Sequence, residues 1–318
     1  MEIAKFLHEQ NIDFYVVVHK AHGDEVVDQL DGGKDKLVNQ LGRLRVVHYI
    51  IESEDELRDI LNQAPAQFIF GLGPRWIFSD ETRNLASRWI NININKVPEF
   101  LGGAHVSWQI MNQDMNLFIT FQEITGKVDK GPVLKQYKFI YPSSAKQPKD
   151  YLMFNAEKAV ECFANYIDGP LPDTNAKVDI DWNNSTYWPR LRADTNGWIN
   201  WSWSAEHIIS FIKAFSHPYG GARTLLNGKT VLIFDAEIAC KAEYHPFACG
   251  LILRAKSELK FVAVRDALLK LNLTYIEGKP KGTKTVGSRL FTPSSLLEQS
   301  LESIVTTQEL NRRAEIEN

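Results

Sequence analysis

Short apolar runs alternate with helix-like stretches through the first half of this 318-residue chain, and that alternation is its strongest constraint on the fold. Apolar runs bounded by turn residues predict strands, and apolar residues at helical spacing predict helices. Strands are predicted at 14–18, 44–51, 67–71, 89–94 and 117–121, and helices at 2–10, 24–41, 55–62, 80–86, 104–111 and 151–167. The alternation favours an α/β fold with a parallel sheet covered on both faces.

Residues 90–95 alternate isoleucine with asparagine. A strand here buries the isoleucines on one face and projects three amides from the other. Pro98 and the glycines at 102 and 103 end the strand, and a short helix and a second buried strand follow. Residues 125–131 then form a polar loop that places Asp129 between two glycines.

Residues 91–131 resemble the active-site core of the 10-formyltetrahydrofolate-dependent formyltransferases, the family of methionyl-tRNA and nucleotide-sugar formyltransferases. That family carries Asn-x-His-x-Ser-x-Leu-Pro-x-x-x-Gly and, after a helix and a strand, a loop that ends in Asp-x-Gly. The matching residues are Asn91, Pro98, Gly102, Asp129 and Gly131. Asn93 stands where the family has its catalytic histidine, and Asn95 stands where it has serine.

The resemblance implies catalytic positions at Asn91, Asn93 and Asp129. In the family the asparagine amide stabilises the oxyanion of the tetrahedral intermediate, and the carboxylate raises the pKa of the histidine. Asn93 offers no basic nitrogen, because an amide provides only donors and a carbonyl acceptor. General acid–base catalysis contributes roughly 10²–10⁴-fold, so the sequence predicts a severe loss of rate rather than a different reaction.

The resemblance also implies that two loops hold 10-formyltetrahydrofolate, the cosubstrate. The implied residues are Arg75, Trp76 and Ile77 in the first loop and Thr125, Gly126, Lys127 and Val128 in the second. An equally good interpretation of Trp76 is that its side chain packs in the hydrophobic core. His105 is the histidine nearest to position 93, and a polar residue at a helix start is the more ordinary interpretation of it.

The resemblance resumes near Arg190 and predicts a second domain. We expect a Rossmann-like formyltransferase domain over 1–175, a linker over 176–195, a small OB-like β-barrel over 196–294 and a tail helix over 295–318. Ser204 is the expected N-cap of the second domain's helix, and residues 295–298 have the spacing of a capping box. The chain begins on a helix, whereas the family's first domain begins with a strand, so we expect either that this strand is absent or that the gene start is misplaced, and the second alternative is preferred.

Composition excludes several classes of protein. The chain is 44% hydrophobic and 24% charged, which is typical of a globular protein, and no apolar run approaches the length of a membrane span. Three widely spaced cysteines indicate neither a disulfide framework nor a zinc site, so we expect no metal and a cytoplasmic location. Residues 195–294 carry more basic side chains than acidic ones. This excess either attracts an anionic substrate or belongs to an ordinary solvent-exposed face.

The acceptor amine is the least constrained part of the prediction. The stretch at 20–25 is partly acidic and would contribute little to the binding of the tRNA phosphate backbone. We therefore prefer a nucleotide-linked amino sugar as the acceptor. Methionyl-tRNA is the first alternative, and a catalytically inactive folate- or nucleotide-sugar-binding homologue is the second. The apolar stripe Leu297, Leu301, Ile304 and Val305 is expected either to dock on the body or to form a homodimer contact.

Overall fold

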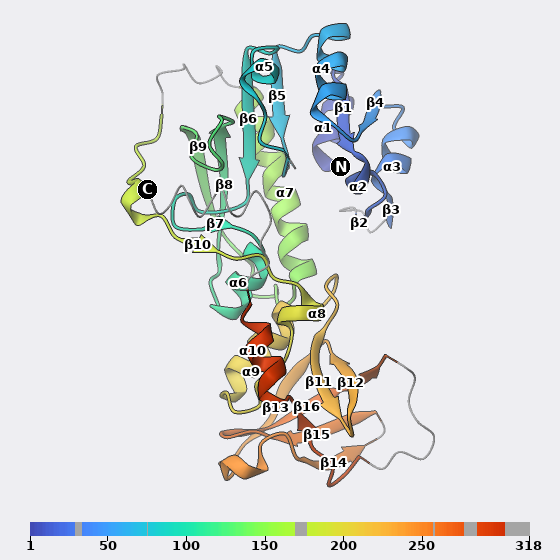
Figure 1. The fold of residues 1–318 in the computed structure, drawn as a ribbon, viewed down its shortest axis with the longest axis vertical. Coiled ribbons are helices and arrows are strands. Elements are labelled where there is room, and N and C mark those ends of the chain that lie inside the picture. Colours follow the sequence, from blue (N-terminus) through green and yellow to red (C-terminus); the bar gives the residue numbers. More distant parts are fainter. Residues whose placement is uncertain (29–33, 75, 169–176, 257, 277–284, 303–318) are drawn as a thin grey trace.

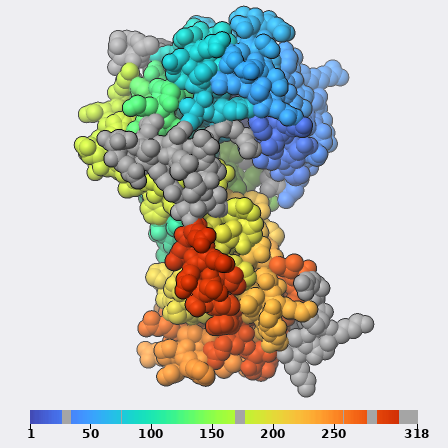
Figure 2. Space-filling view, viewed as in Figure 1, coloured from blue at the N-terminus to red at the C-terminus, as the bar shows by residue number. Residues whose placement is uncertain are grey.

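The computed structural model describes residues 1–28, 34–74, 76–168, 177–256, 258–276 and 285–302. These residues form an α/β lobe and a β-rich lobe, with α7 (Pro148–Ile167) running lengthwise through the first (Figure 1). Figure 2 shows the two lobes as separate masses, joined where α10 (Ser294–Ser300) lies. In this part of the chain no helix is both long and apolar enough to span a membrane.

The first strands form a small parallel pair. β1 (Val16–His19) pairs with β4 (His48–Ile51). The surrounding elements are α1 (Glu2–Glu9), α2 (Lys20–Gly23), β2 (Val26–Asp28), β3 (Lys34–Lys36) and α3 (Leu37–Arg43). The long helix predicted over 24–41 is wrong, because an antiparallel β2–β3 hairpin interrupts it. The adjacent glycines at 32 and 33 disfavour a continuous helix.

A four-stranded sheet carries the stretch singled out from the sequence. Its order is β5 (Phe68–Gly71), β6 (Arg88–Asn93), β8 (Asn116–Glu123) and β9 (Val133–Ile140). The β5–β6 pair is parallel, but β8 and β9 are antiparallel to their neighbours, so the sheet is mixed rather than wholly parallel. The accompanying elements are α4 (Glu54–Gln63), α5 (Asp80–Arg83), β7 (Leu101–Gly102) and α6 (His105–Met111).

The two sheets share no hydrogen-bonded ladder among the described residues, since β1 pairs only with β4 and β5 only with β6. Side chains hold the two parts together instead. Leu57 and Leu61 of α4 pack with Ile51, Trp89 and the partly buried Val17.

One aromatic chain links the N-terminal part to the sheet. The Phe163 ring of α7 lies edge-on to Phe6 of α1 at 6.3 Å and to Phe70 of β5 at 5.0 Å. Tyr166, one turn further along α7, stacks on Phe121 of β8 at 4.3 Å. Aromatic side chains bury large areas and prefer such edge-on and stacked contacts, so α7 is the common support of α1 and the sheet.

The second lobe contains two four-stranded antiparallel sheets and α9 (Ala205–Ala214). Its strands are β11 (Ala222–Leu226), β12 (Lys229–Ile233), β13 (Ala236–Lys241), β14 (Ile252–Lys256), β15 (Leu259–Ala263), β16 (Ala267–Asn272), β17 (Thr274–Tyr275) and β18 (Leu290–Phe291). A bridge between Leu251 and Arg289 connects the two sheets, so the second lobe is a β-rich domain, as expected. The Ser204 hydroxyl accepts from the His207 amide, so the predicted N-cap is confirmed.

The segment between the lobes contains short elements and ends against α10. These are the 3₁₀-helix Trp182–Asn184, β10 (Tyr187–Trp188), which pairs with β7, and α8 (Ala193–Asn196). A second 3₁₀-helix, Pro246–Ala248, lies in the second lobe. α10 begins at Ser294 with no side-chain cap, so the predicted capping box is wrong. The Asn196 amide donates to the Ser300 and Glu302 carbonyls, which docks α10 on α8. Leu301 is exposed, and Ile304 and Val305 lie outside the described residues.

Replacing Phe163→Ala tests whether α7 holds the N-terminal part. Removing a fully buried phenylalanine ring is expected to lower the free energy of unfolding by about 3–5 kcal/mol. Phe247→Ala is the matched control, because that ring is 79% exposed. Urea unfolding measures both. Equal and small losses in the two variants would contradict the role assigned to α7.

Candidate functional site

The candidate site begins on the polar face of β6. Ile90 and Ile92 are buried in the main core, while Asn91 and Asn93 project from the opposite face, as the alternation predicts. Asn95 lies beyond the end of the strand, and its amide donates to the Phe100 carbonyl. The strand therefore presents two of the three predicted amides together.

The two amides belong to a hydrogen-bonded chain. Asn91 Nδ2 donates to Asn93 Oδ1 at 2.8 Å, and Asn93 Nδ2 donates to Gln122 Oε1 at 3.0 Å. Gln122 Nε2 then donates to the main-chain carbonyls of Asp129 at 2.7 Å and Gly131 at 2.8 Å. We call this set the amide chain.

The backbone carbonyls at the end of the amide chain determine which amide groups donate and which accept. Backbone carbonyls only accept hydrogen bonds, so Gln122 must turn its NH₂ group toward the loop and its oxygen toward Asn93. Asn93 must then donate to Gln122 and accept from Asn91. Asn91 Oδ1 is left buried and accepts no hydrogen bond from the described residues. None of the three side chains titrates, so the chain transmits orientation and carries no proton-accepting group.

Sequence reasoning missed Gln122. It lies directly opposite Asn91 in the β6–β8 register and is 1% exposed. The sequence could have pointed to Gln122 as a polar residue directly after the apolar strand predicted at 117–121. Its hydrogen-bond partners, however, can be identified only from the antiparallel pairing of β6 with β8. Buried polar side chains are normally satisfied, and Gln122 uses both ends of its amide.

The loop that carries Asp129 is fixed by backbone geometry. Asp129 has a positive φ of 54°, and its main-chain carbonyl faces Gln122. A Cβ on Gly131 would lie 1.8 Å from the Glu123 carbonyl oxygen, so only glycine fits there. The structure therefore connects Asp129 to Asn93 through Gln122 and the loop backbone.

The first of the two loops predicted to hold the cosubstrate begins beside the amide chain. A Cβ on Gly71 would lie 3.4 Å from Asn91 Oδ1, so the first loop leaves β5 beside the buried acceptor. Trp76 packs against the cluster around Phe78 and Trp89, and its ring lies 5.0 Å from that of His19. These contacts favour an anchoring role for Trp76. Ile77 is half-buried, and Arg75 lies outside the described residues.

Arg83 joins the two loops and was also missed. Its guanidinium donates to the Phe78 carbonyl and to Asp80, and it lies against Gly126, where an added Cβ would be 3.4 Å from Nη2. Within the second loop the Thr125 hydroxyl bonds the amide and the carbonyl of Lys127, each at 3.2 Å. The backbone next to Val128 is therefore hydrogen-bonded on both sides, at Lys127 by Thr125 and at Asp129 by Gln122.

His105 does not join the amide chain. It opens α6 and lines a cavity of about 10 Å³ with Asn95 and Gln109, which is room for about one water molecule. No three His, Cys, Asp or Glu side chains gather for a metal ion within the described ranges.

Replacing Gln122→Met tests the amide chain. The substitution keeps the side-chain length but leaves two carbonyls and the Asn93 amide unpaired, so unfolding should become easier by at least about 2 kcal/mol. Gln63→Met at the exposed end of α4 is the control and should be nearly neutral. Urea unfolding gives both values. A neutral Gln122→Met variant would show that the chain does not hold the 129–131 loop.

Comparison with known proteins identifies relatives for both lobes. Residues 193–286 match the family model described as formyl transferase, C-terminal domain. Methionyl-tRNA formyltransferase from Thermodesulfovibrio yellowstonii is 26% identical over 217 residues, which cover 67% of this chain and 65% of the relative. The enzyme of the same name from Streptococcus equi subsp. equi is 26% identical over 195 residues, 60% of each chain. The chain thus matches less than two thirds of the length of these curated relatives.

Solved structures share the fold. An N-formyltransferase from Helicobacter canadensis, solved with folinic acid and dTDP-3-aminofucose, superposes with a TM-score of 0.60 at 16% identity, covering 86% of this chain and 95% of the other. A sugar 3N-formyltransferase solved in the presence of dTDP and 5-N-formyl-THF gives 0.60 at 15% identity over 87% and 94%. A methionyl-tRNA formyltransferase from Clostridium thermocellum gives 0.51 at 12% identity over 80% and 98%. At these identities the likeness establishes the fold alone.

Proposed function

Because the chain belongs to the formyltransferase family, we propose that it transfers a formyl group from 10-formyltetrahydrofolate to the amine of a nucleotide-linked sugar, at a rate limited by Asn93. The amide chain is the observation that carries this proposal. Asn91 and Asn93 are two of the positions that the resemblance implies to be catalytic, and their hydrogen bonds give both amides a defined orientation.

The residues around the amide chain fit the folate cosubstrate. The buried Asn91 oxygen accepts no hydrogen bond from the part of the chain that the structure describes, and a catalytic or ligand-binding role is one physical reason for such an atom. In the proposal, Trp76 anchors the first loop and Ile77 of that loop holds the cosubstrate on one side, and Thr125, Gly126, Lys127 and Val128 hold it on the other. When bound, 10-formyltetrahydrofolate supplies an activated formyl group.

The three side chains of the amide chain can orient reactants but cannot take the proton of the attacking amine. Asn93 uses its oxygen to accept from Asn91 and its NH₂ group to donate to Gln122, and its nitrogen is not basic. The Asn91 NH₂ group is a donor suited to an oxyanion. Removal of the amine proton is therefore the slow step in the proposed reaction.

Charge pairing near α2 supports an amino sugar over tRNA. Lys20 pairs with Glu52, and Lys36 pairs with Asp24 at 2.8 Å. His22 lies 3.0 Å from the Glu25 carboxylate. Cations already paired with carboxylates add little to the binding of a phosphate backbone. The similarity of fold to two sugar N-formyltransferases agrees with this choice but does not decide it.

Replacing Asn93→His tests the proposed function. An imidazole at this position adds a proton acceptor, so formyl transfer to a nucleotide amino sugar should rise at least about tenfold, a fall of about 1.4 kcal/mol in the barrier. The gain should appear as the pH rises through about 6.5, where imidazole loses its proton. Release of tetrahydrofolate with added nucleotide amino sugars is the measurement.

Asn93→Gln is the control for that experiment, because it keeps an amide and adds no base. The assignment of Asn93 as the rate-limiting position is wrong if the parent already turns over at an ordinary rate. It is also wrong if the histidine variant binds folate but is no faster. Faster transfer to methionyl-tRNA than to any amino sugar would replace the proposed acceptor. Folate binding without transfer in every variant would identify a binding protein.

A further inference from the structure

The Arg83 guanidinium connects the two loops that the proposed function assigns to the cosubstrate. Its edge donates to the Phe78 carbonyl, at the end of the first loop, and pairs with Asp80. Its face lies against Gly126 in the second loop. A Cβ added to Gly126 would be 3.4 Å from Nη2, 3.6 Å from Nη1 and 3.9 Å from Cζ. Such similar distances place that Cβ over the plane of the guanidinium rather than at its edge.

The first loop is fixed at the residue that Arg83 contacts. Phe78 is 7% exposed, and its ring packs on that of Trp89 in β6 at 4.8 Å. The next residue, Ser79, donates its amide to Glu54 at 2.7 Å. Trp89 Nε1 in turn donates to the Arg83 carbonyl at 3.0 Å. The Arg83 side chain therefore extends to the second loop from a fixed support.

Arg83 contacts the second loop between two points that are themselves held. The Ile124 amide donates to a carbonyl of β6 at 2.9 Å, and the amide chain holds the Asp129 carbonyl. Gly126 lies between these points and is exposed. Its φ is not positive, so the backbone conformation there does not itself require glycine. The absence of a side chain instead lets the loop lie flat on the guanidinium.

Arginine suits this position better than another cation. A guanidinium is planar and presents several N–H groups along its edge, so it can hold one loop with its edge and support another with its face. A lysine ammonium is a point charge and has no such face. The Arg83 side chain is 18% exposed, which agrees with a group that is packed between segments of the chain.

We propose that Arg83 is a positioning residue for the folate cosubstrate. It fixes the second loop against the first and thereby sets the affinity of both loops for the ligand, without touching the ligand itself. Loops held in the binding conformation lose less entropy when a ligand binds. This inference deepens the proposed function and rests on it for the identity of the ligand.

Calorimetric titration of the full chain with 5-formyltetrahydrofolate tests the positioning role. Arg83→Gln should bind at least about tenfold more weakly, because the second loop is no longer held. Arg58→Gln is the matched control. Arg58 is 23% exposed and pairs with the aspartate three residues before it, as Arg83 does, but its hydrogen bonds and ion pairs go to neither loop. This control should bind as the parent does.

Two outcomes of that titration would overturn the proposal. One is equal affinity in the parent and in Arg83→Gln. The other is an equal loss in Arg58→Gln and Arg83→Gln, which would reflect a general loss of structure around α5. Urea unfolding of both variants shows that each is folded under the conditions of the titration.

Attraction of the anionic folate by positive charge is a different explanation of a loss in Arg83→Gln. Arg83→Lys separates the two, because it keeps the charge and removes the planar face. Positioning predicts a loss close to that of Arg83→Gln, and full affinity in Arg83→Lys would show that the proposal is wrong.

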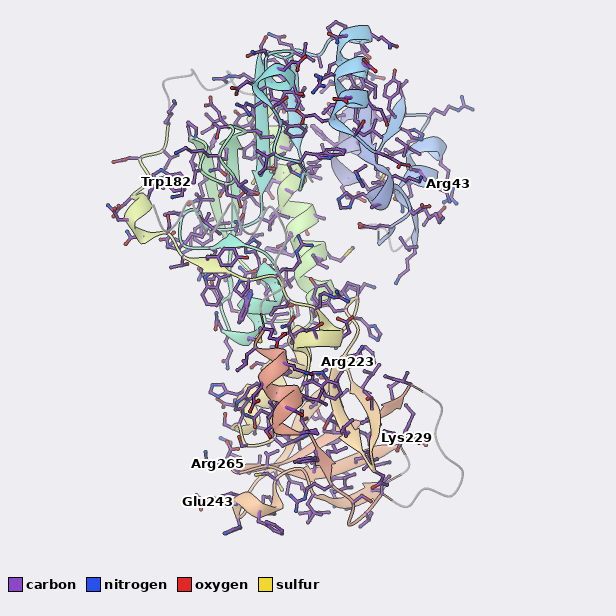
Figure 3. The ribbon with its side chains drawn as sticks, viewed as in Figure 1. Arg43, Trp182, Arg223, Lys229, Glu243 and Arg265 are labelled. Carbon is purple, nitrogen blue, oxygen red and sulfur yellow. The ribbon has the colours of Figure 1, made fainter. Side chains whose placement is uncertain are left out.

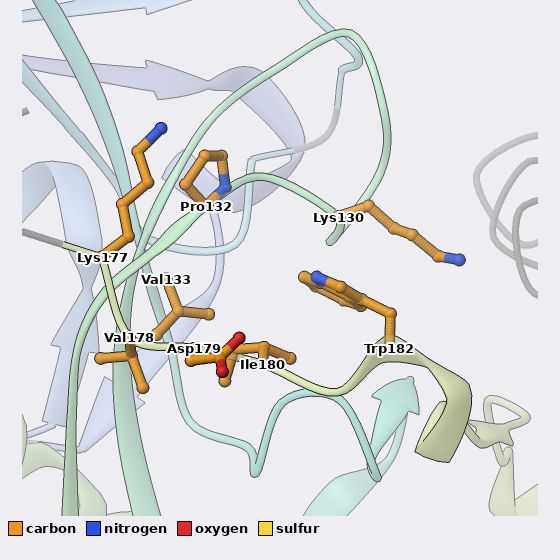
Figure 4. Close-up of a pocket in the computed structure, with 8 residues that line it drawn as sticks. All are labelled: Lys130, Pro132, Val133, Lys177, Val178, Asp179, Ile180 and Trp182. Atoms are coloured by element: carbon orange, nitrogen blue, oxygen red, sulfur yellow. The ribbon is translucent and has the colours of Figure 1, made fainter. Parts of the chain in front are cut away.

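Two charge controls accompany the lysine variant. Arg43→Gln removes a charge from α3, at the outer edge of the N-terminal part (Figure 3). Lys130→Gln removes one from the second loop itself, where Lys130 lines a pocket of about 280 Å³ beside Trp182 (Figure 4). Both should weaken folate binding less than Arg83→Gln does, since neither alters the contact between Arg83 and Gly126.

Gly126→Val tests the same contact from the other loop. The added branches would meet the guanidinium and displace the second loop, so folate binding should weaken. If Arg83 acts through Gly126, the double variant Arg83→Gln/Gly126→Val should lose less binding free energy than the two single variants together. Additive losses would mean that the two residues act independently, and would contradict the proposal.

The result is separable from the proposed function, because folate binding is measured without turnover. Folate affinity that depends on Arg83, with no formyl transfer by the Asn93→His variant, supports the positioning role and contradicts the function. Formyl transfer by the Asn93→His variant with a KM for 10-formyltetrahydrofolate that Arg83→Gln leaves unchanged supports the function and contradicts the positioning role.

Discussion

The packing of α7 against one face of β6 and β8 is the constraint on which the rest of the structure depends. Ile90, Ile92 and Phe121 are buried in the same cluster as Phe163 and Tyr166 of this helix. Because side chains alternate along a strand, burying one face of β6 directs its amides to the other. A shift of register by one residue would bury the amides and expose the isoleucines.

The amide chain turns this alternation into a defined site. Gln122 lies opposite Asn91, and its two donors end on fixed backbone carbonyls, so every amide has only one orientation. A histidine at position 93 would add a titrating group to the same frame. With Asn93 the three amides are neutral and each has a defined orientation, and in the function proposed above the step that they cannot assist is proton transfer.

The N-terminal part is joined to this frame by side chains alone among the described residues. β1 and β5 share no ladder, and the contacts that replace it are the α4 cluster and the Phe6–Phe163 pair. Backbone hydrogen bonds fix register, whereas apolar contacts tolerate small displacements. The two lobes are linked more firmly, since Ser107 of α6 donates to the Ala214 carbonyl at the end of α9 and one core cluster spans both.

The sequence by itself determined the strand predicted at 89–94, which the structure has at 88–93, together with its buried and polar faces, the α/β class and the N-cap at Ser204. These features depend on local periodicity and turn chemistry. It misjudged the helix over 24–41 and the cap of α10, where neighbouring segments outweigh local propensity. Only the tertiary structure identified Gln122, Arg83 and the pocket beside Trp182. Each of these is made by residues far apart in sequence, and no local pattern reports which side chains antiparallel pairing and loop packing bring together.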